Sequence, residues 1–179
     1  MIRTIATAAA ILLTACGGGE PATSQVGASS AQADWQRWHG DKQAVDLAVA
    51  EKINAPGGGD YAGAIDVLRR SDRPEDVRQF QIGMLVIDGF EDATARRAPE
   101  TLEQGLRMVE DATTLNGEMR RNGPQQLRLL FERGAGRTPD TIPVDAKIAG
   151  CWHRLENGGK GDPHDCIALR RDRLPKVGR

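Results

Sequence analysis

Two cysteines and two histidines near the carboxyl end are the residues whose types and spacing could most readily do chemistry. Cys151-x-His153 and His164-x-Cys166 place two thiols and two imidazoles in a mirrored arrangement. These four side chains could hold a zinc ion tetrahedrally, although paired zinc ligands usually have two to four residues between them and here there is one. The other interpretation is a Cys151–Cys166 disulfide that closes a loop of about 15 residues. The compartment in which the protein resides decides between them.

The amino-terminal sequence predicts the compartment. Arg3 precedes an apolar run at residues 5–15, which is too short to span a membrane and is typical of a secretory signal peptide. Leu13-Thr14-Ala15-Cys16 follows and resembles the signal-peptide motif of bacterial lipoproteins. The resemblance implies cleavage before Cys16, lipidation of its thiol and acylation of the new amino group. Because Gly rather than Asp occupies position 17, it also implies the periplasm-facing outer membrane.

Export favours the disulfide, because an oxidising compartment competes against thiolate ligation of zinc. We therefore predict a Cys151–Cys166 disulfide, no metal site and no cofactor. Residues 16–33 are rich in Gly, Ser and Ala and are predicted to form a flexible tether. The predicted organisation is a signal peptide at 1–15, a lipidated tether at 16–33, a single all-α domain at 34–175 and a tail at 176–179.

Signals of catalysis are missing from the rest of the sequence. It contains no phosphate-binding loop, no dinucleotide fingerprint, no HExxH and no GxSxG. Three acidic pairs, Glu75-Asp76, Glu91-Asp92 and Glu110-Asp111, are adjacent in sequence, and adjacent residues on a helix do not face each other. We expect these pairs, and the basic run that begins at Arg170, to be solvated surface charge. An enzyme is not predicted.

The composition suits one small helical domain. The chain has 179 residues, a formal charge of −1 and 39% hydrophobic residues, which excludes the basic footprint of a nucleic-acid-binding protein. Apolar residues recur at helical spacing, and no segment shows sustained strand-like alternation. The predicted fold is all-α, with about six helices stacked as antiparallel hairpins or packed as a compact bundle. Helices are predicted at 41–53 and 60–70, from about 75, from Pro99 to about 115, from Gly123-Pro124 to Gly134, after Pro143, and briefly around Cys166.

A possible internal repeat underlies the hairpin prediction. Ile82-Gly83-x-x-Val86-x-x-Gly89 aligns with Leu127-Arg128-x-x-Phe131-x-x-Gly134 at an offset of 45 residues. The pattern resembles the Sel-like repeats of the tetratricopeptide superfamily, which implies stacked helical hairpins and a protein-binding surface. This sequence departs from the family in its longer period and in having Arg128 and Val86 where Gly and an aromatic residue are expected.

The segment from Ile87 to Ala98 is predicted to be a long connection between two helices. Long connections are often functional, so the sequence predicts that Asp88, Phe90, Glu91 and Asp92 contact a partner, with Phe90 as an apolar anchor among acids. Phe90 folding back into the core is the alternative.

These features predict a monomeric, lipid-anchored periplasmic protein that binds another protein. The favoured function is that of an immunity or inhibitor lipoprotein, which neutralises a toxin or secreted enzyme. The alternative is an envelope scaffold or adaptor lipoprotein. Neither function requires nucleic acid, and the membrane is contacted only through the lipid.

Overall fold

The protein is described by a computed structural model at residues 42–174, where it forms seven helices and one small hairpin. The elements in chain order are α2 (Lys42–Ile53), α3 (Tyr61–Arg69), α4 (Glu75–Glu91), α5 (Leu102–Ala112), α6 (Met119–Arg133), β1 (Ala135–Arg137), β2 (Asp140–Ile142), α7 (Ala146–Glu156) and α8 (Pro163–Arg173).

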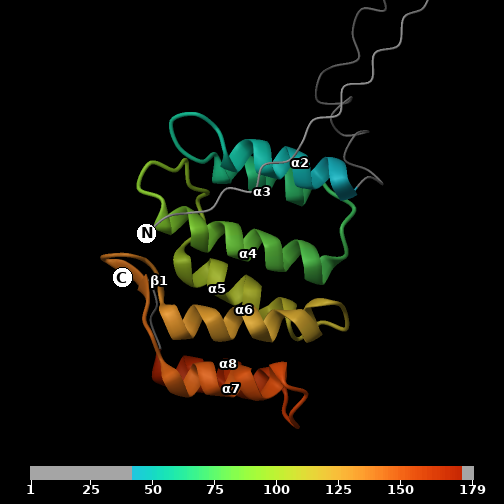
Figure 1. Ribbon diagram of the computed structural model, residues 1–179, viewed down its shortest axis with the longest axis vertical. Coiled ribbons are helices and arrows are strands. Elements are labelled where there is room, and N and C mark those ends of the chain that lie inside the picture. Colours follow the sequence, from blue (N-terminus) through green and yellow to red (C-terminus); the bar gives the residue numbers. More distant parts are fainter. Residues whose placement is uncertain (1–41, 175–179) are drawn as a thin grey trace, which may run out of the picture.

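The helices pack as consecutive pairs that are stacked along the long axis of the molecule (Figure 1). Helix α2 packs on α3, α4 on α5, and α6 on α7. Contacts of α3 with α4 and of α5 with α6 join the pairs, and α8 packs against α7 at the far end. The predicted helical fold with packed hairpins is therefore confirmed.

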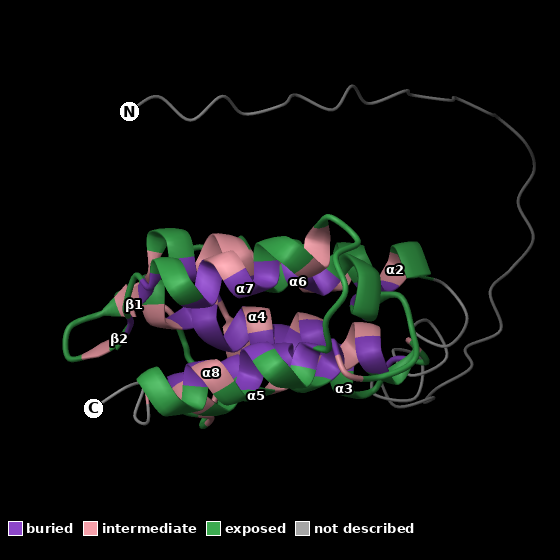
Figure 2. Ribbon diagram, turned by 90° about the horizontal axis from the view of Figure 1, so that it is seen from below, coloured by how far each residue is buried: buried purple, intermediate pink, exposed green. Residues whose placement is uncertain are grey.

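Buried residues gather between the helices (Figure 2) and form two clusters that meet at α4. Ile82, Leu85 and Val86 of α4 join the cluster built with α2 and α3. Phe80 and Ile87 of the same helix join the larger cluster, which includes α5, α6, the hairpin, α7 and α8. Because α4 contributes side chains to both clusters, it couples the two ends of the stack.

The approach of α4 to α5 depends on two glycines. A Cβ atom on Gly83 would lie 2.6 Å from the carbonyl oxygen of Gly105, so no larger residue fits without movement of the backbone. At the position aligned with Gly83, Arg128 of α6 instead forms ion pairs with Glu132 and with Glu156 of α7. The two aligned segments thus meet their partner helices through different contacts.

The start of α3 agrees with the sequence, whereas α5 begins at Leu102, three residues after the predicted start at Pro99. Asp60 accepts a hydrogen bond from the Gly63 N–H at the start of α3. Thr101 and Gln104 form a capping box at α5, and Asp162 and Asp165 form another at α8. Each of these caps lies within four residues in sequence, so the chain encodes it directly.

Helix α6 begins at Met119, four residues before the predicted start at Gly123-Pro124. Its first turn is capped from a distance, because the Met119 N–H donates to Oδ2 of Asp76 on α4 at 2.9 Å. This buried carboxylate, 43 residues away, satisfies a donor that has no partner within the helix. Pro124 is accommodated near the N-terminal end, and the prediction that it marks the helix start is wrong.

The segment after α6 forms a two-stranded antiparallel hairpin, which the sequence did not predict. Ala135 pairs with Ile142 and Arg137 with Asp140, around a turn that contains a cis Thr138–Pro139 peptide bond. Gly134 ends α6 with a positive φ of 71°, a conformation that suits glycine. Strands of three residues are too short to show an alternating pattern.

The predicted disulfide is confirmed. Cys151 of α7 and Cys166 of α8 are bonded, with their Cα atoms 5.6 Å apart. Both thiols are therefore engaged, and the zinc alternative loses its two sulfur ligands. His153 is mostly exposed and lies 3.5 Å from Glu156.

Three predictions concern residues outside the described range: the signal peptide at 1–15, lipidation at Cys16 with its tether at 16–33, and the tail at 176–179. Within residues 42–174, no helix has both the length and the apolar character needed to cross a membrane.

Candidate functional site

Among the described residues, a groove is formed by α2, the end of α3, the first and middle parts of α4 and the start of α6. It consists of two adjoining hollows of about 340 Å³ and about 200 Å³ that share Asp46, Phe80 and Gln81. The first hollow is also lined by Lys42, Arg73, Pro74, Val77, Glu118 and Met119. The second is also lined by Val49, Leu68, Met84 and Leu85.

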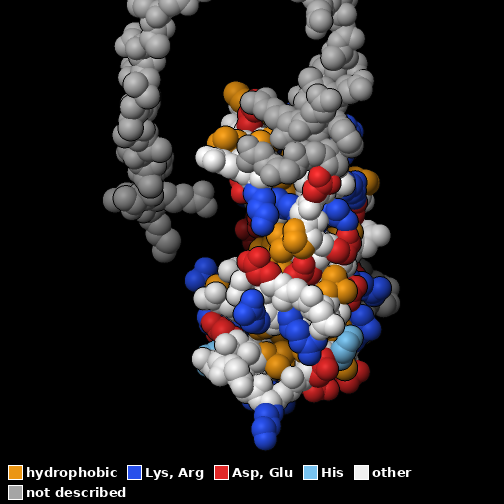
Figure 3. All heavy atoms as spheres, turned by 90° about the vertical axis from the view of Figure 1, so that its right-hand side faces the viewer, with side chains coloured by type: hydrophobic (Ala, Val, Ile, Leu, Met, Phe, Trp, Pro, Cys, Tyr) orange, Lys and Arg blue, Asp and Glu red, His pale blue; other side chains and the backbone are white. Residues whose placement is uncertain are grey.

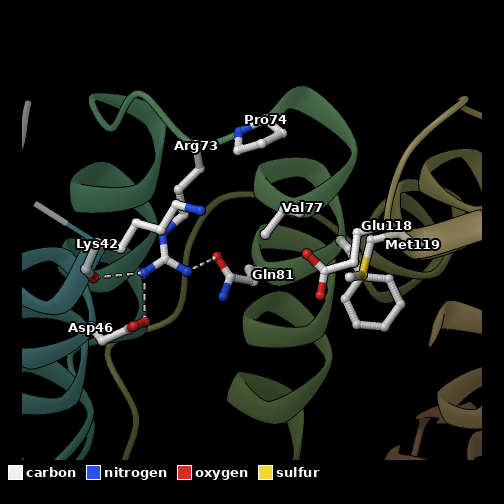
Figure 4. Close-up of a pocket in the computed structure, with 9 residues that line it drawn as sticks. Lys42, Asp46, Arg73, Pro74, Val77, Gln81, Glu118 and Met119 are labelled. Atoms are coloured by element: carbon white, nitrogen blue, oxygen red, sulfur yellow. Dashed lines mark hydrogen bonds and ion pairs between the residues drawn. The ribbon is translucent and has the colours of Figure 1, made fainter. Parts of the chain in front are cut away.

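Arg73 sits on one wall of the first hollow and ties α2 to α4 (Figure 4). Its guanidinium donates to Gln81 Oε1 of α4 at 2.8 Å and to the Lys42 carbonyl oxygen of α2 at 3.1 Å. It also pairs with the Asp46 carboxylate. Because only 9% of the Arg73 side chain is exposed, these contacts fix the wall in place. Its buried Nε has no hydrogen-bond partner among the described atoms.

The opposite wall of the first hollow is Glu118 and Met119, which project toward it from the start of α6 (Figure 4). Asp76 places this wall, because its hydrogen bond to the Met119 N–H joins the first turns of α4 and α6. The α4 helix therefore supplies the floor of the hollow and also positions both of its walls.

The floor is apolar and the rim is charged. Val77 and Met84 are partly buried against the larger core cluster, and Phe80 is 9% exposed. Lys42, Asp46 and Glu118 stand around this floor and carry both signs of charge. An apolar floor with a polar rim is also the composition of ligand pockets and of the central pockets of protein interfaces.

On the side of the stack shown in Figure 3, acidic and basic side chains are interspersed with small apolar patches. No single sign of charge dominates this face. Interspersed charges of this kind produce no strong long-range field from this face.

The four partner residues predicted from the sequence lie elsewhere, around the end of α4. This helix extends to Glu91, so Asp88, Phe90 and Glu91 belong to its last turn and the predicted start of the connection at Ile87 is wrong. The connection begins only at Asp92. Phe90 of this turn packs on both core clusters. This packing holds the last turn in the helix, although the apolar pattern of the sequence is weaker there.

The acids at this end gather around Tyr61 of α3. Burial, and secondly the Glu91 carboxylate, raise the pKa of Asp88 to about 6. Burial and the neighbouring Asp88, Asp92 and Glu91 also raise the pKa of Tyr61. Hydrogen bonds from the Thr94 hydroxyl and backbone N–H lower the pKa of Asp92. The Asp92 carboxylate thus stabilises the turn that follows α4, whereas the Asp88 carboxyl group is half-buried.

Phe90 is partly buried and packs against both core clusters. The Arg97 guanidinium carbon lies 4.7 Å from the centroid of its ring. Phe90 therefore packs against the core, in line with the alternative prediction that it folds back there. Its contact with a partner remains a prediction.

Three residues that the sequence assigned to the solvated surface are buried, namely Arg170, Glu110 and Asp76. Arg170 of α8 is 1% exposed and donates to Glu110 of α5, at 2.9 and 2.6 Å, and to Glu103 at 3.0 Å. Glu110 itself is fully buried. Burial raises the pKa of Glu110, against the opposing effect of Arg170. The prediction of surface charge is wrong for both residues and for Asp76, which is 6% exposed.

Comparison with known proteins gives no assignment. No family model, curated protein or solved structure matches this chain. The evidence about function therefore comes from the groove and from the sequence.

The sequence indicated the floor residues but not the groove. Val77 and Phe80 fall on the apolar side of the helix that is predicted from about residue 75, which is the usual signature of a core position. Nothing in the sequence indicated that the other described residues would leave part of this face uncovered. Arg73 carried no local signal, because its partners Lys42 and Asp46 are 31 and 27 residues away.

Proposed function

We propose that this protein is a lipid-anchored binding module, facing the periplasm from the outer membrane, that binds a peptide segment of another protein in the α2–α4–α6 groove. The observation that carries the proposal is the pair of adjoining hollows with an apolar floor and a charged rim. The anchor rests on the resemblance of residues 13–16 to a lipoprotein signal.

The chemistry of the groove supports binding rather than catalysis. Its polar residues are Lys42, Asp46, Arg73, Gln81 and Glu118. Arg73 is held by Asp46 and Gln81, and so it serves as a structural cation. None of the lining residues is Ser, Cys or His, and the described residues contain no group of three or more potential metal ligands.

A groove of this size on a small anchored domain is better suited to one partner than to several. This favours an immunity or inhibitor lipoprotein, which neutralises a toxin or secreted enzyme, over an envelope scaffold or adaptor. The groove would engage one exposed segment of that partner, with a bulky apolar side chain in a hollow and charged neighbours at the rim.

Selection from a random peptide library tests the binding proposal. The bait is the full chain from residue 16 onward, with Cys16→Ser to prevent acylation. We expect selected peptides to share a bulky apolar residue flanked by charges. Their affinity should fall at least about tenfold, or about 1.4 kcal/mol, in Val77→Glu, which places a charge on the apolar floor.

Leu47→Glu is the matched control, because Leu47 is 64% exposed on α2 and lines neither hollow. Circular dichroism must show that both variants are folded. Equal binding by wild type and Val77→Glu would remove the groove as the binding site. Selected peptides that bind the wild type and are lost in Leu47→Glu would place the site on the outer face of α2.

A further inference from the structure

The chain enters the described fold at the edge of the groove. Lys42 is the first described residue, it lines the first hollow, and its carbonyl oxygen accepts a hydrogen bond from Arg73 at 3.1 Å. The residues that precede Lys42 are therefore joined to the fold at the mouth of this hollow.

Those residues include the two large aromatic side chains of the amino-terminal part of the chain. Trp38 lies four residues before Lys42 and Trp35 lies seven before it, and residues 1–41 contain no other Trp, Phe or Tyr. Between helical and fully extended spacing, four residues reach about 6 to 14 Å and seven reach about 10 to 25 Å. Both indoles can thus reach the groove.

The sequence between Trp38 and Lys42 also suits a reversal of direction. Gly40 lies in this short segment, and glycine is the residue that most readily adopts turn conformations. The second hollow lies further along α2, beside Val49, than the first, beside Lys42. A chain that turns back at Gly40 would meet the first hollow and then the second.

We propose that residues 34–41 occupy the groove of the same molecule, with Trp38 in the first hollow and Trp35 in the second, whenever no partner is bound. Two adjoining hollows with an apolar floor match two aromatic side chains three residues apart, and indoles gain a large apolar area on burial.

Docking of residues 34–41 would control access to the groove. This consequence rests on the proposed function, because it requires a partner peptide that binds in the same groove. A partner peptide must displace the segment, so its apparent affinity is reduced by the fraction of molecules whose groove is filled. Displacement would also free the residues that link the domain to Cys16 and lengthen the tether when the partner arrives.

Tryptophan fluorescence tests the docking. The full chain from residue 16 with Cys16→Ser contains Trp35, Trp38 and Trp152. Trp152 is fully buried and supplies a constant background. We expect Trp35 and Trp38 to be shielded from acrylamide. Val77→Glu should red-shift their emission and raise their quenching several-fold, whereas Leu47→Glu should leave both unchanged. Trp35→Phe and Trp38→Phe assign each contribution.

A cross-link provides a second measurement that leaves the floor intact. Trp38→Cys combined with Glu118→Cys, on the exposed wall of the first hollow, should react with a short bis-maleimide to give an intramolecular product. Trp38→Cys with Leu47→Cys should not. Strong quenching of both indoles in the wild type, together with absence of the cross-link between positions 38 and 118, would overturn the proposal.

Competition separates this proposal from the proposed function. A library-selected peptide should bind the Trp35→Ala/Trp38→Ala variant several-fold more tightly than the wild type and should red-shift the wild-type emission. Peptide binding with both indoles already exposed would overturn self-docking and retain the binding function. Shielded indoles with no peptide bound by either chain would retain self-docking and overturn the binding function.

Discussion

Asp88 illustrates how one side chain departs from its expected chemistry when helices pack around it. Its carboxyl group is half-buried in the last turn of α4, close to Glu91 and Tyr61. Burial favours the protonated form because the charged form loses water, and the Glu91 carboxylate acts in the same direction. Together they raise the pKa of Asp88 to about 6.

The consequence for stability follows from linkage. Below about pH 4 the Asp88 carboxyl is protonated in both the folded and unfolded chains, and it contributes no pH dependence. Between about pH 4 and the folded pKa of about 6, the unfolded chain releases the proton first, so the free energy of unfolding falls as pH rises. Above about pH 6 the loss of stability caused by the buried Asp88 charge no longer grows with pH.

We therefore expect Asp88→Asn to stabilise the protein at pH 7 by about 1–2 kcal/mol, a figure reduced for the exposed part of the side chain, and to have little effect at pH 4. Urea unfolding at several pH values measures the difference between variant and wild type. Asp111→Asn, at an exposed residue of α5, is the control. A gain that is the same at pH 4 and pH 7 would contradict the assigned pKa.

At the scale of the elements, distant polar contacts join helices that have no local reason to associate. Arg170 of α8 reaches Glu110 and Glu103 of α5 across 60 and 67 residues. Asp76 of α4 caps α6. Both contacts are buried and hydrogen-bonded, which makes the loss of one partner more costly than the contact itself is worth.

Arg170→Met is expected to destabilise the protein by about 3–5 kcal/mol, because it leaves the Glu110 carboxylate buried without a cation. Combining it with Glu110→Leu should recover most of the loss, since the double variant buries no charge. Thermal or urea unfolding of the two single variants and the double variant gives the coupling energy. If the two losses simply add, the pair is not coupled as described.

Asp76→Ala should cost about 1–3 kcal/mol by leaving the buried Met119 N–H without an acceptor. Hydrogen exchange of amides in the first turn of α6 should accelerate before that of α7. Glu75→Ala, at the adjacent exposed residue of α4, provides the comparison and should change stability by less than about 1 kcal/mol. Similar losses from both variants would indicate that the helix terminus is held by something other than Asp76.

The whole molecule combines a stack of helix pairs with a predicted lipid at Cys16. If that residue carries the anchor, the domain lies within reach of the membrane without any spanning helix in its described part. A tether of residues 16–33 would hold the domain roughly 20–25 Å from the lipid when it is unstructured.

Cys16→Ser should therefore abolish lipidation without changing the unfolding curve of the domain. Metabolic labelling with a palmitate analogue should be lost in the same variant. Cys151→Ser/Cys166→Ser is the contrasting change, because it should retain the lipid and lower stability by about 3 kcal/mol for a loop of about 15 residues. Palmitate labelling that persists in Cys16→Ser would contradict the anchor.

The sequence by itself determined the helical class and the position of most helices. Helical spacing of apolar residues and local caps such as Asp60 are short-range properties, so they can be read without knowing the fold. The Cys151–Cys166 disulfide was also predictable, because export favours oxidation and few other pairings were available.

Only the tertiary structure decided where charge is buried and where the described residues leave an apolar face uncovered. The burial of Glu110, Arg170 and Asp76 depends on partners more than 40 residues away, and their local sequences look the same as those of solvated residues. The groove likewise depends on how far α2 and α6 stand from α4. Long-range packing sets these distances, and local propensity carries no information about them.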